Sequence, residues 1–182
     1  MNAIAESLDP AEFVRSYTTD KYGEEIAAWS GATLPEDLID VLKDLKVPQI
    51  AYAEISAALS EAVLPIFEKE HPDDPEPRQA IGIIKSWLKD QTEANVRAAK
   101  QLWVFHAANT SSDAAVDDPA GAAAYAAHTV LCHAILSIAS PFPALSAQRA
   151  AFTASRAGLP NRRAMSLVKE VGHKYFAFLS KG

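Results

Sequence analysis

The sequence predicts an all-α fold: a single-domain bundle of about seven to eight helices with Ala-rich helices at its centre. Apolar residues make up 49% of the chain and there are only 7 glycines, a composition that favours helices. Apolar residues recur at the three-to-four-residue spacing of a helix face, and few alternate with polar residues as they would in a strand. Prolines stand at or near the start of several of these segments, where a missing N–H costs little.

The chain has the length of one domain, since 182 residues can bury a core without further covalent support. We expect one helical domain over 1–182, made of three parts: acidic N-terminal helices (1–72), a core segment (74–140) and C-terminal helices (141–182).

Three short helices are expected first. Asp9-Pro10 is a cap followed by a proline in the first helical position, which predicts a helix to about Thr18. A second helix is expected from Glu24 to Ser30. The third starts at Pro35 with an acidic first turn, as the helix dipole favours. Its face carries three acids at i, i+3 and i+7, namely Asp37, Asp40 and Asp44.

A longer helix is expected from Pro48 to about Glu70, with a broad apolar stripe. Pro65 lies inside it and predicts a kink or a break near Val63, because proline removes a backbone hydrogen bond and crowds the preceding turn. Residues 71–77 then form a stiff acidic linker that holds three prolines.

The next helix, which reaches about Leu88, has an unusual start. Asp74 caps it and Pro75 takes its first position. Arg78 then lies near a helix N-terminus, which is unfavourable for a cation, so we expect it to pair with Asp74 four residues earlier. Trp87 is interpreted as a core anchor. Gly82, in mid-helix, suggests a close approach by another helix.

Two Ala-rich helices follow, from Thr92 to about Ala108 and from Asp118 to about Ala139, joined by a polar loop over 109–117. Alanine lets helix backbones approach closely, so these helices should be central. Two further helices, at about 144–156 and 161–179, complete the bundle.

The charge changes sign along the chain. Residues 1–77 hold 5 Lys and Arg against 17 Asp and Glu, a net charge of −12, whereas residues 78–182 hold 12 against 6, a net charge of +6. An acidic first half repels nucleic acid and attracts basic protein surfaces. The alternative is a solvated face on surface helices that serves solubility alone. The basic pair Arg162-Arg163 lacks interleaved aromatic residues, so a nucleic-acid interface is not expected.

No arrangement typical of a catalytic, metal or cofactor site is found. The sequence lacks a G-x-S-x-G pattern, a phosphate loop, a dinucleotide fingerprint and H-E-x-x-H. His128 and His133 are five residues apart, about 140° around a helix, so one ion could not easily use both. Cys132 lies in an apolar run and is expected to be a small buried side chain.

The N-terminus shows no basic region followed by an apolar region, and no window approaches 18 consecutive apolar residues. We therefore expect no signal peptide and no membrane span, and a cytoplasmic protein.

The segment from Asp74 to about Ser140 resembles a group of small all-helical immunity proteins from bacterial polymorphic-toxin systems, the family numbered five. Three blocks carry the resemblance: Asp74, Pro77-Arg78, Ala80-Ile81 and Trp87; then Arg97-Ala98-Ala99 and His106-Ala107-Ala108; then His128 and His133 in an Ala-rich helix. In the family the two late histidines are six residues apart, whereas here they are five apart.

The resemblance implies a non-catalytic antitoxin without cofactor or metal, which stays in the cytoplasm and binds one cognate protein toxin. It also implies that Arg78 with Asp74, and His106 with His128, form a buried polar framework that fixes helix packing. The acidic first half would suit a basic toxin such as a nuclease, with Asp37, Asp40 and Asp44 as candidate partner-binding residues. The alternatives are a helical adaptor or scaffold with another protein partner and, third, a metal-dependent enzyme that uses the histidines.

Overall fold

The chain is all-α, as predicted. A computed structural model describes residues 22–109, 118–136, 143–177 and 179, and for residues 105–109 and 136 it describes the backbone alone. The helix expected from Asp9 to Thr18, the polar loop after Asn109 and the chain that follows Leu136 as far as 142 lie outside the described residues.

The described helices follow the predicted order, with ends that differ by a few residues. Residues 22–31 are helical and are followed by α2 (Pro35–Asp44), α3 (Gln49–Glu70), α4 (Glu76–Lys89), α5 (Glu93–Asn109), α6 (Pro119–Thr129), α7 (Leu131–Leu136), α8 (Pro143–Arg156) and α9 (Asn161–Tyr175).

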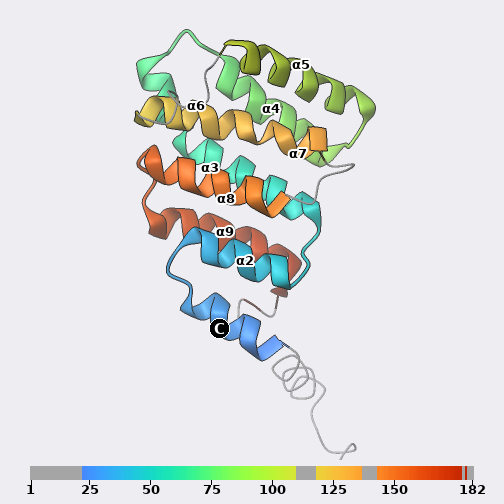
Figure 1. The fold of residues 1–182 in the computed structure, drawn as a ribbon, viewed down its shortest axis with the longest axis vertical. Coiled ribbons are helices and arrows are strands. Elements are labelled where there is room, and N and C mark those ends of the chain that lie inside the picture. Colours follow the sequence, from blue (N-terminus) through green and yellow to red (C-terminus); the bar gives the residue numbers. More distant parts are fainter. Residues whose placement is uncertain (1–21, 110–117, 137–142, 178, 180–182) are drawn as a thin grey trace, which may run out of the picture.

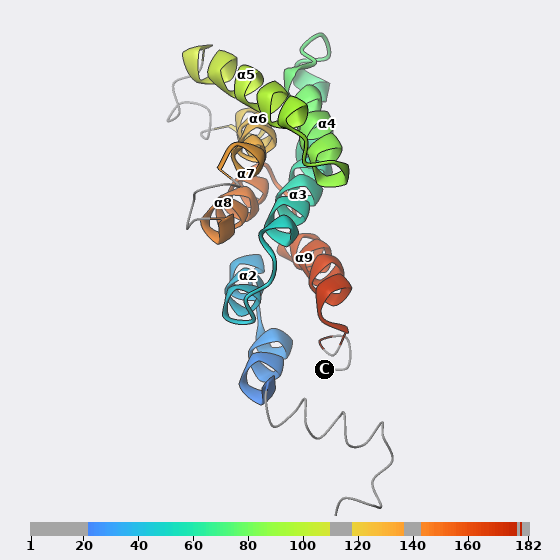
Figure 2. The same cartoon turned by 90° about the vertical axis from the view of Figure 1, so that its right-hand side faces the viewer.

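The helices stack along the long axis of the molecule in two layers (Figures 1 and 2). One layer contains α2, α8 and α6–α7, and the other contains α9, α3 and α4. Neighbours contact within each layer and across the two, and α5 packs on α4 and α7 at one end. The helix at residues 22–31 lies at the opposite end.

Helix α3 is the centre of the stack, since it contacts α4, α6, α7, α8 and α9. It is long and apolar enough to cross a membrane by length and composition alone, but most of that stretch is buried among other helices, as in the core helix of a folded domain. Small residues allow a close contact with α6: the hydroxyl of Ser60 on α3 donates to the carbonyl of Ala126 on α6, and Ser60, Ala123 and Ala126 are all buried.

Two of the sequence predictions about helix continuity are wrong. The first is the kink or break near Val63: the break is wrong, because α3 continues through Pro65. The proline ring and Glu61, whose carbonyl would otherwise accept from residue 65, both lie on the exposed side of the helix. Water can bond the freed carbonyl there, so the helix tolerates the proline.

The second is the uninterrupted helix from Asp118 to Ala139, which divides at Val130 into α6 and α7. The carbonyl of Ala126 accepts hydrogen bonds from the hydroxyls of Ser60 and Thr129, each at 2.8 Å. In a continuous helix this carbonyl would accept from the N–H of Val130. The hydroxyls therefore take the place of a helical hydrogen bond where the break occurs.

The close approach predicted at Gly82 is also wrong, because Gly82 is exposed and a Cβ placed on it would have no atom within 4 Å. The close approach is at Gly172 in α9, where a Cβ would lie 2.4 Å from Cη2 of Trp29. Trp29 is only 2% exposed, so Gly172 provides the space in which helix 22–31 docks. Leu179 is buried, although α9, which was expected to reach residue 179, ends earlier, at Tyr175.

Candidate functional site

A buried histidine joins α6 to the start of α4. His128, with a side chain only 3% exposed, contacts Oε1 of Glu76 through Nε2 at 3.1 Å, and Nδ1 donates to the carbonyl of Ala124 at 2.8 Å. Because Nδ1 carries a proton, a hydrogen bond between Nε2 and the carboxyl of Glu76 needs a second proton. That proton is held by Nε2 or by the carboxyl group. Burial lowers the pKa of His128, and the bonds to Ala124 and Glu76 oppose that effect.

The predicted pairing of Arg78 with Asp74 is wrong. The guanidinium of Arg78 forms a bidentate salt bridge with Glu68 at the end of α3, with Nε–Oε1 and Nη2–Oε2 distances of 2.5 and 2.6 Å. Asp74 instead accepts from the N–H of Glu76 at 2.9 Å. The Arg78 side chain is 66% exposed, so the prediction that it belongs to a buried framework is also wrong.

Because the Arg78–Glu68 salt bridge is exposed, we expect its removal to change the melting temperature only slightly. Arg78→Ala should change the melting temperature by no more than Lys85→Ala, which removes the neighbouring exposed pair with Glu61. Thermal unfolding of the two variants beside wild type measures this. A loss at Arg78 several times larger than at Lys85 would show that the residue has a structural role beyond the exposed pair.

A second buried histidine joins α7 to α3. Nε2 of His133 lies 2.8 Å from the hydroxyl of Ser56, which is completely buried. Burial lowers the pKa of His133 to about 4, so the ring is neutral near pH 7. His128 and His133 thus bond to different helices. Among the described residues, no group of three or more His, Cys, Asp or Glu side chains is placed to hold a metal ion.

The structure describes Trp87 and Cys132, two further residues named in the sequence analysis, but not the side chain of His106. Trp87 is 3% exposed and packs in the apolar cluster shared by α3, α4, α5 and α7. The side chain of His106 lies outside the described residues. Cys132 is partly buried, and burial raises the pKa of its thiol to about 11, so it is protonated and unreactive near neutral pH.

The acidic first half divides into paired and unpaired carboxylates. Along α3, Glu54, Glu61 and Glu68 recur every seven residues, and each forms a salt bridge with a cation of a neighbouring helix. These cations are Lys174 of α9 and Lys85 and Arg78 of α4. The three glutamates thus bind helices together, and their charge is neutralised within the fold.

The acidic face of α2 differs from that stripe. Asp37, Asp40 and Asp44 are exposed as predicted, and none of them forms a salt bridge with a described residue. Asp37 accepts from the N–H groups of Thr33 and Leu34 at the helix start, and Asp40 accepts from Gln148 of α8 at 2.9 Å. Burial, with smaller contributions from the charges of Asp44 and Asp40, raises the pKa of Tyr52 to about 12.

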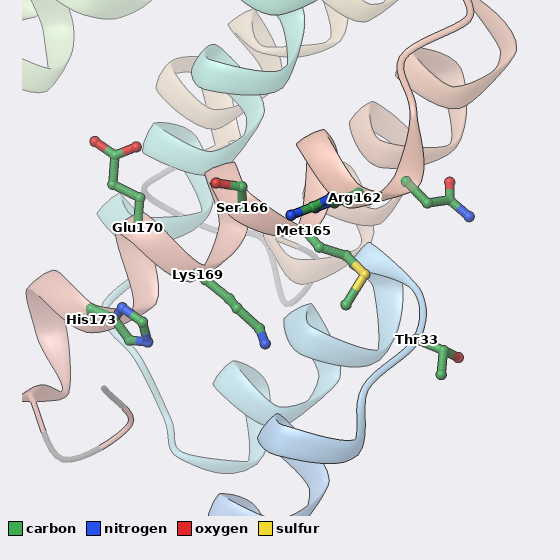
Figure 3. A pocket seen from close by; sticks show the side chains of 8 residues that line it. Thr33, Arg162, Met165, Ser166, Lys169, Glu170 and His173 are labelled. Atoms are coloured by element: carbon green, nitrogen blue, oxygen red, sulfur yellow. The ribbon is translucent and has the colours of Figure 1, made fainter. Parts of the chain in front are cut away.

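A shallow groove of about 720 Å³ runs beside α9 (Figure 3). Cationic and polar side chains of α9 line it together with Met165 and Thr33, and the cations are Arg162 and Lys169. Lys169 and Met165 are directed to one side of α9, and Glu170 is directed away from them. Neither Arg162 nor Lys169 forms a salt bridge within the described part of the chain. The groove can therefore hold a segment that carries both apolar atoms and negative charge.

Comparison with known protein families identifies the chain. Residues 46–138 match the family described as Imm-5 like putative immunity protein. The chain belongs to this family. No curated protein and no solved structure matches it. This match confirms the predicted resemblance. The matched segment of this Imm-5-like protein begins at residue 46, whereas the resemblance began at Asp74, so the match also includes α3.

The matched segment holds both buried histidines and their partners, which are Ser56 for His133 and Glu76 for His128. The acidic face of α2, all of α8 and the α9 groove lie outside it. In this Imm-5-like chain the family segment therefore supplies the central helices, whereas the acidic face of α2, helix α8 and the groove beside α9 belong to the flanking helices.

Proposed function

We propose that this protein is a non-catalytic immunity protein, an antitoxin that binds and neutralises a cognate toxin domain in the cytoplasm of the cell that makes both. The match of residues 46–138 to an immunity-protein family carries the proposal, because such a family implies a protein toxin as partner. Neutralisation would follow from blocking the toxin's active site or its substrate surface.

The bonding of the buried polar groups supports a binding role rather than catalysis. His133 bonds to Ser56 across α7 and α3, His128 contacts Glu76 across α6 and α4, and Ser60 bonds to the backbone of α6. Each of these groups therefore joins two helices. An enzyme would instead direct at least one such group into a pocket where a substrate could reach it.

The unpaired acids of α2 support a basic partner. Since the glutamates of α3 are neutralised by neighbouring cations, the negative potential that a partner meets comes in part from Asp37, Asp40 and Asp44. Such a row steers a positively charged surface toward it and speeds the encounter.

Growth rescue tests the proposal. The proposal predicts a toxin gene beside the gene for this chain. The toxin domain that it encodes is expressed in a sensitive host with the chain or with an unrelated helical protein of similar size. We expect growth with the chain and arrest with the unrelated protein. Continued arrest in cells that accumulate folded chain would contradict the proposed function.

Charge reversal on α2 tests the basic partner. Asp40→Lys with Asp44→Lys should slow association with the toxin domain about tenfold at low salt and flatten its salt dependence, since steering is lost. Asp37 is left intact because it caps α2. Stopped-flow kinetics measure this, with Asp73→Lys and Asp90→Lys as a control of equal charge change at exposed positions. Equal rates in both double variants would exclude a specific role for α2.

A further inference from the structure

Large exposed apolar side chains are concentrated on α8. Among the described residues four large hydrophobic side chains are exposed: Leu34 at 44%, Val104 at 66%, Leu145 at 44% and Phe152 at 55%. Leu145 and Phe152 are seven residues apart on α8 and therefore share one face of it. Arg149 and Arg156 are exposed on the same face, and we call these four residues the α8 stripe.

Helix α8, which carries the stripe, lies between α2 and α6–α7 in one layer of the stack (Figure 1). Gln148, on the edge of α8 toward α2, donates to Asp40. On the other edge, Arg149 is close enough to Cys132 of α7 for its charge to oppose the rise in the pKa of that thiol. The two apolar side chains are thus bordered by the acids of α2 on one edge and by Arg149 toward α7.

This composition matches the centre of a protein–protein interface. Aromatic and arginine side chains are enriched among the residues that contribute most to binding, and acidic borders add orientation and speed. A complementary partner would place cations over α2 and acceptor groups over Arg149. A second copy of this chain is less favoured by charge, because each copy carries a net charge of −6 and like charges repel.

We propose that the α8 stripe is the docking surface for the toxin domain, which anchors on Leu145 and Phe152 and places a basic edge against Asp40 and Asp44. This inference rests on the proposed function and adds the binding face to it. The proposed binding face lies outside residues 46–138. The family segment therefore forms the core against which α8 packs, α2 packs on α8 in turn, and these two helices present the binding face.

The test compares two variants. One is the double variant Leu145→Ser with Phe152→Ser, and the control is Val104→Ser, an exposed position on α5 at the end of the stack. The probe is a catalytically inactive form of the toxin domain encoded beside this chain, and calorimetry gives Kd. We expect binding by the stripe variant to weaken about 30-fold or more and binding by the control to stay within about twofold. All replaced side chains are exposed, so melting temperatures should stay close to wild type.

The outcomes separate this inference from the proposed function. If wild-type protein does not bind the toxin domain, the proposed function fails, and the docking surface with it. If wild type and the stripe variant bind equally, the docking surface is wrong and the proposed function stands. If sedimentation shows a wild-type dimer that the stripe substitutions dissociate, a second copy occupies the stripe and the inference is overturned.

Discussion

Replacing Gly172 with alanine should lower the free energy of unfolding by about 1–3 kcal/mol, the cost of overpacking a close contact. The new Cβ would lie 2.4 Å from Cη2 and 2.9 Å from Cζ2 of Trp29. The indole ring is rigid and buried, so helix 22–31 or α9 must shift to relieve the overlap. That loss should exceed the gain in helix propensity from replacing glycine. Chemical denaturation of the variant and wild type measures the difference.

Gly82→Ala is the matched control. Gly82 also lies inside a helix, but nothing lies within 4 Å of its Cβ position, so alanine should raise stability by about 0.5–1 kcal/mol. Trp29→Phe gives a second control because it removes the overlapping ring atoms. In that background Gly172→Ala should cost clearly less than in wild type. An equal cost in both backgrounds would exclude Trp29 as the cause.

Acidification should destabilise the protein through His133. Burial lowers the pKa of the folded-state imidazole to about 4, whereas an exposed histidine titrates near 6.5. The unfolded chain therefore takes up a proton that the folded chain does not. Stability is fully present above about pH 6.5 and falls by ~1.4 kcal/mol per pH unit down to about pH 4, a total of about 3 kcal/mol from this one group.

His133→Gln isolates that contribution, because glutamine can still bond to Ser56 but does not titrate. Free energies of unfolding from pH 7 to pH 4 should decline less steeply in this variant than in wild type. His71→Gln, at an exposed position, is the matched control for a histidine-to-glutamine substitution. Parallel slopes for wild type and His133→Gln would contradict a buried neutral imidazole.

Much of the fold could be predicted from local sequence. Proline and acidic residues predicted the start of α2, and apolar spacing predicted the course of α3 and α4 within a few residues. The break at Val130 could not be predicted in this way. It depends on Ser60, a residue of α3, whose hydroxyl bonds to the carbonyl of Ala126 in α6. Sequence spacing contains no information about that pairing.

The polar framework shows the same limit. Asp74 was the expected partner of Arg78 because helical spacing relates residues four apart, whereas the actual partner, Glu68, lies across the α3–α4 turn. The acidic cluster at the end of α3 could have suggested it, since a short linker returns α4 alongside α3. The contact between His128 and Glu76 joins residues 52 positions apart, and only the packing of α6 on α4 reveals it.

A titration of toxin activity tests the central claim most directly. The toxin domain that the proposed function predicts to be encoded beside this chain is purified and assayed with increasing amounts of the purified protein. An immunity protein that acts by binding should reduce toxin activity in proportion to its amount and abolish it near one equivalent. Activity that persists in tenfold excess would contradict neutralisation, and complete inactivation by far less than one equivalent would show catalysis instead of binding.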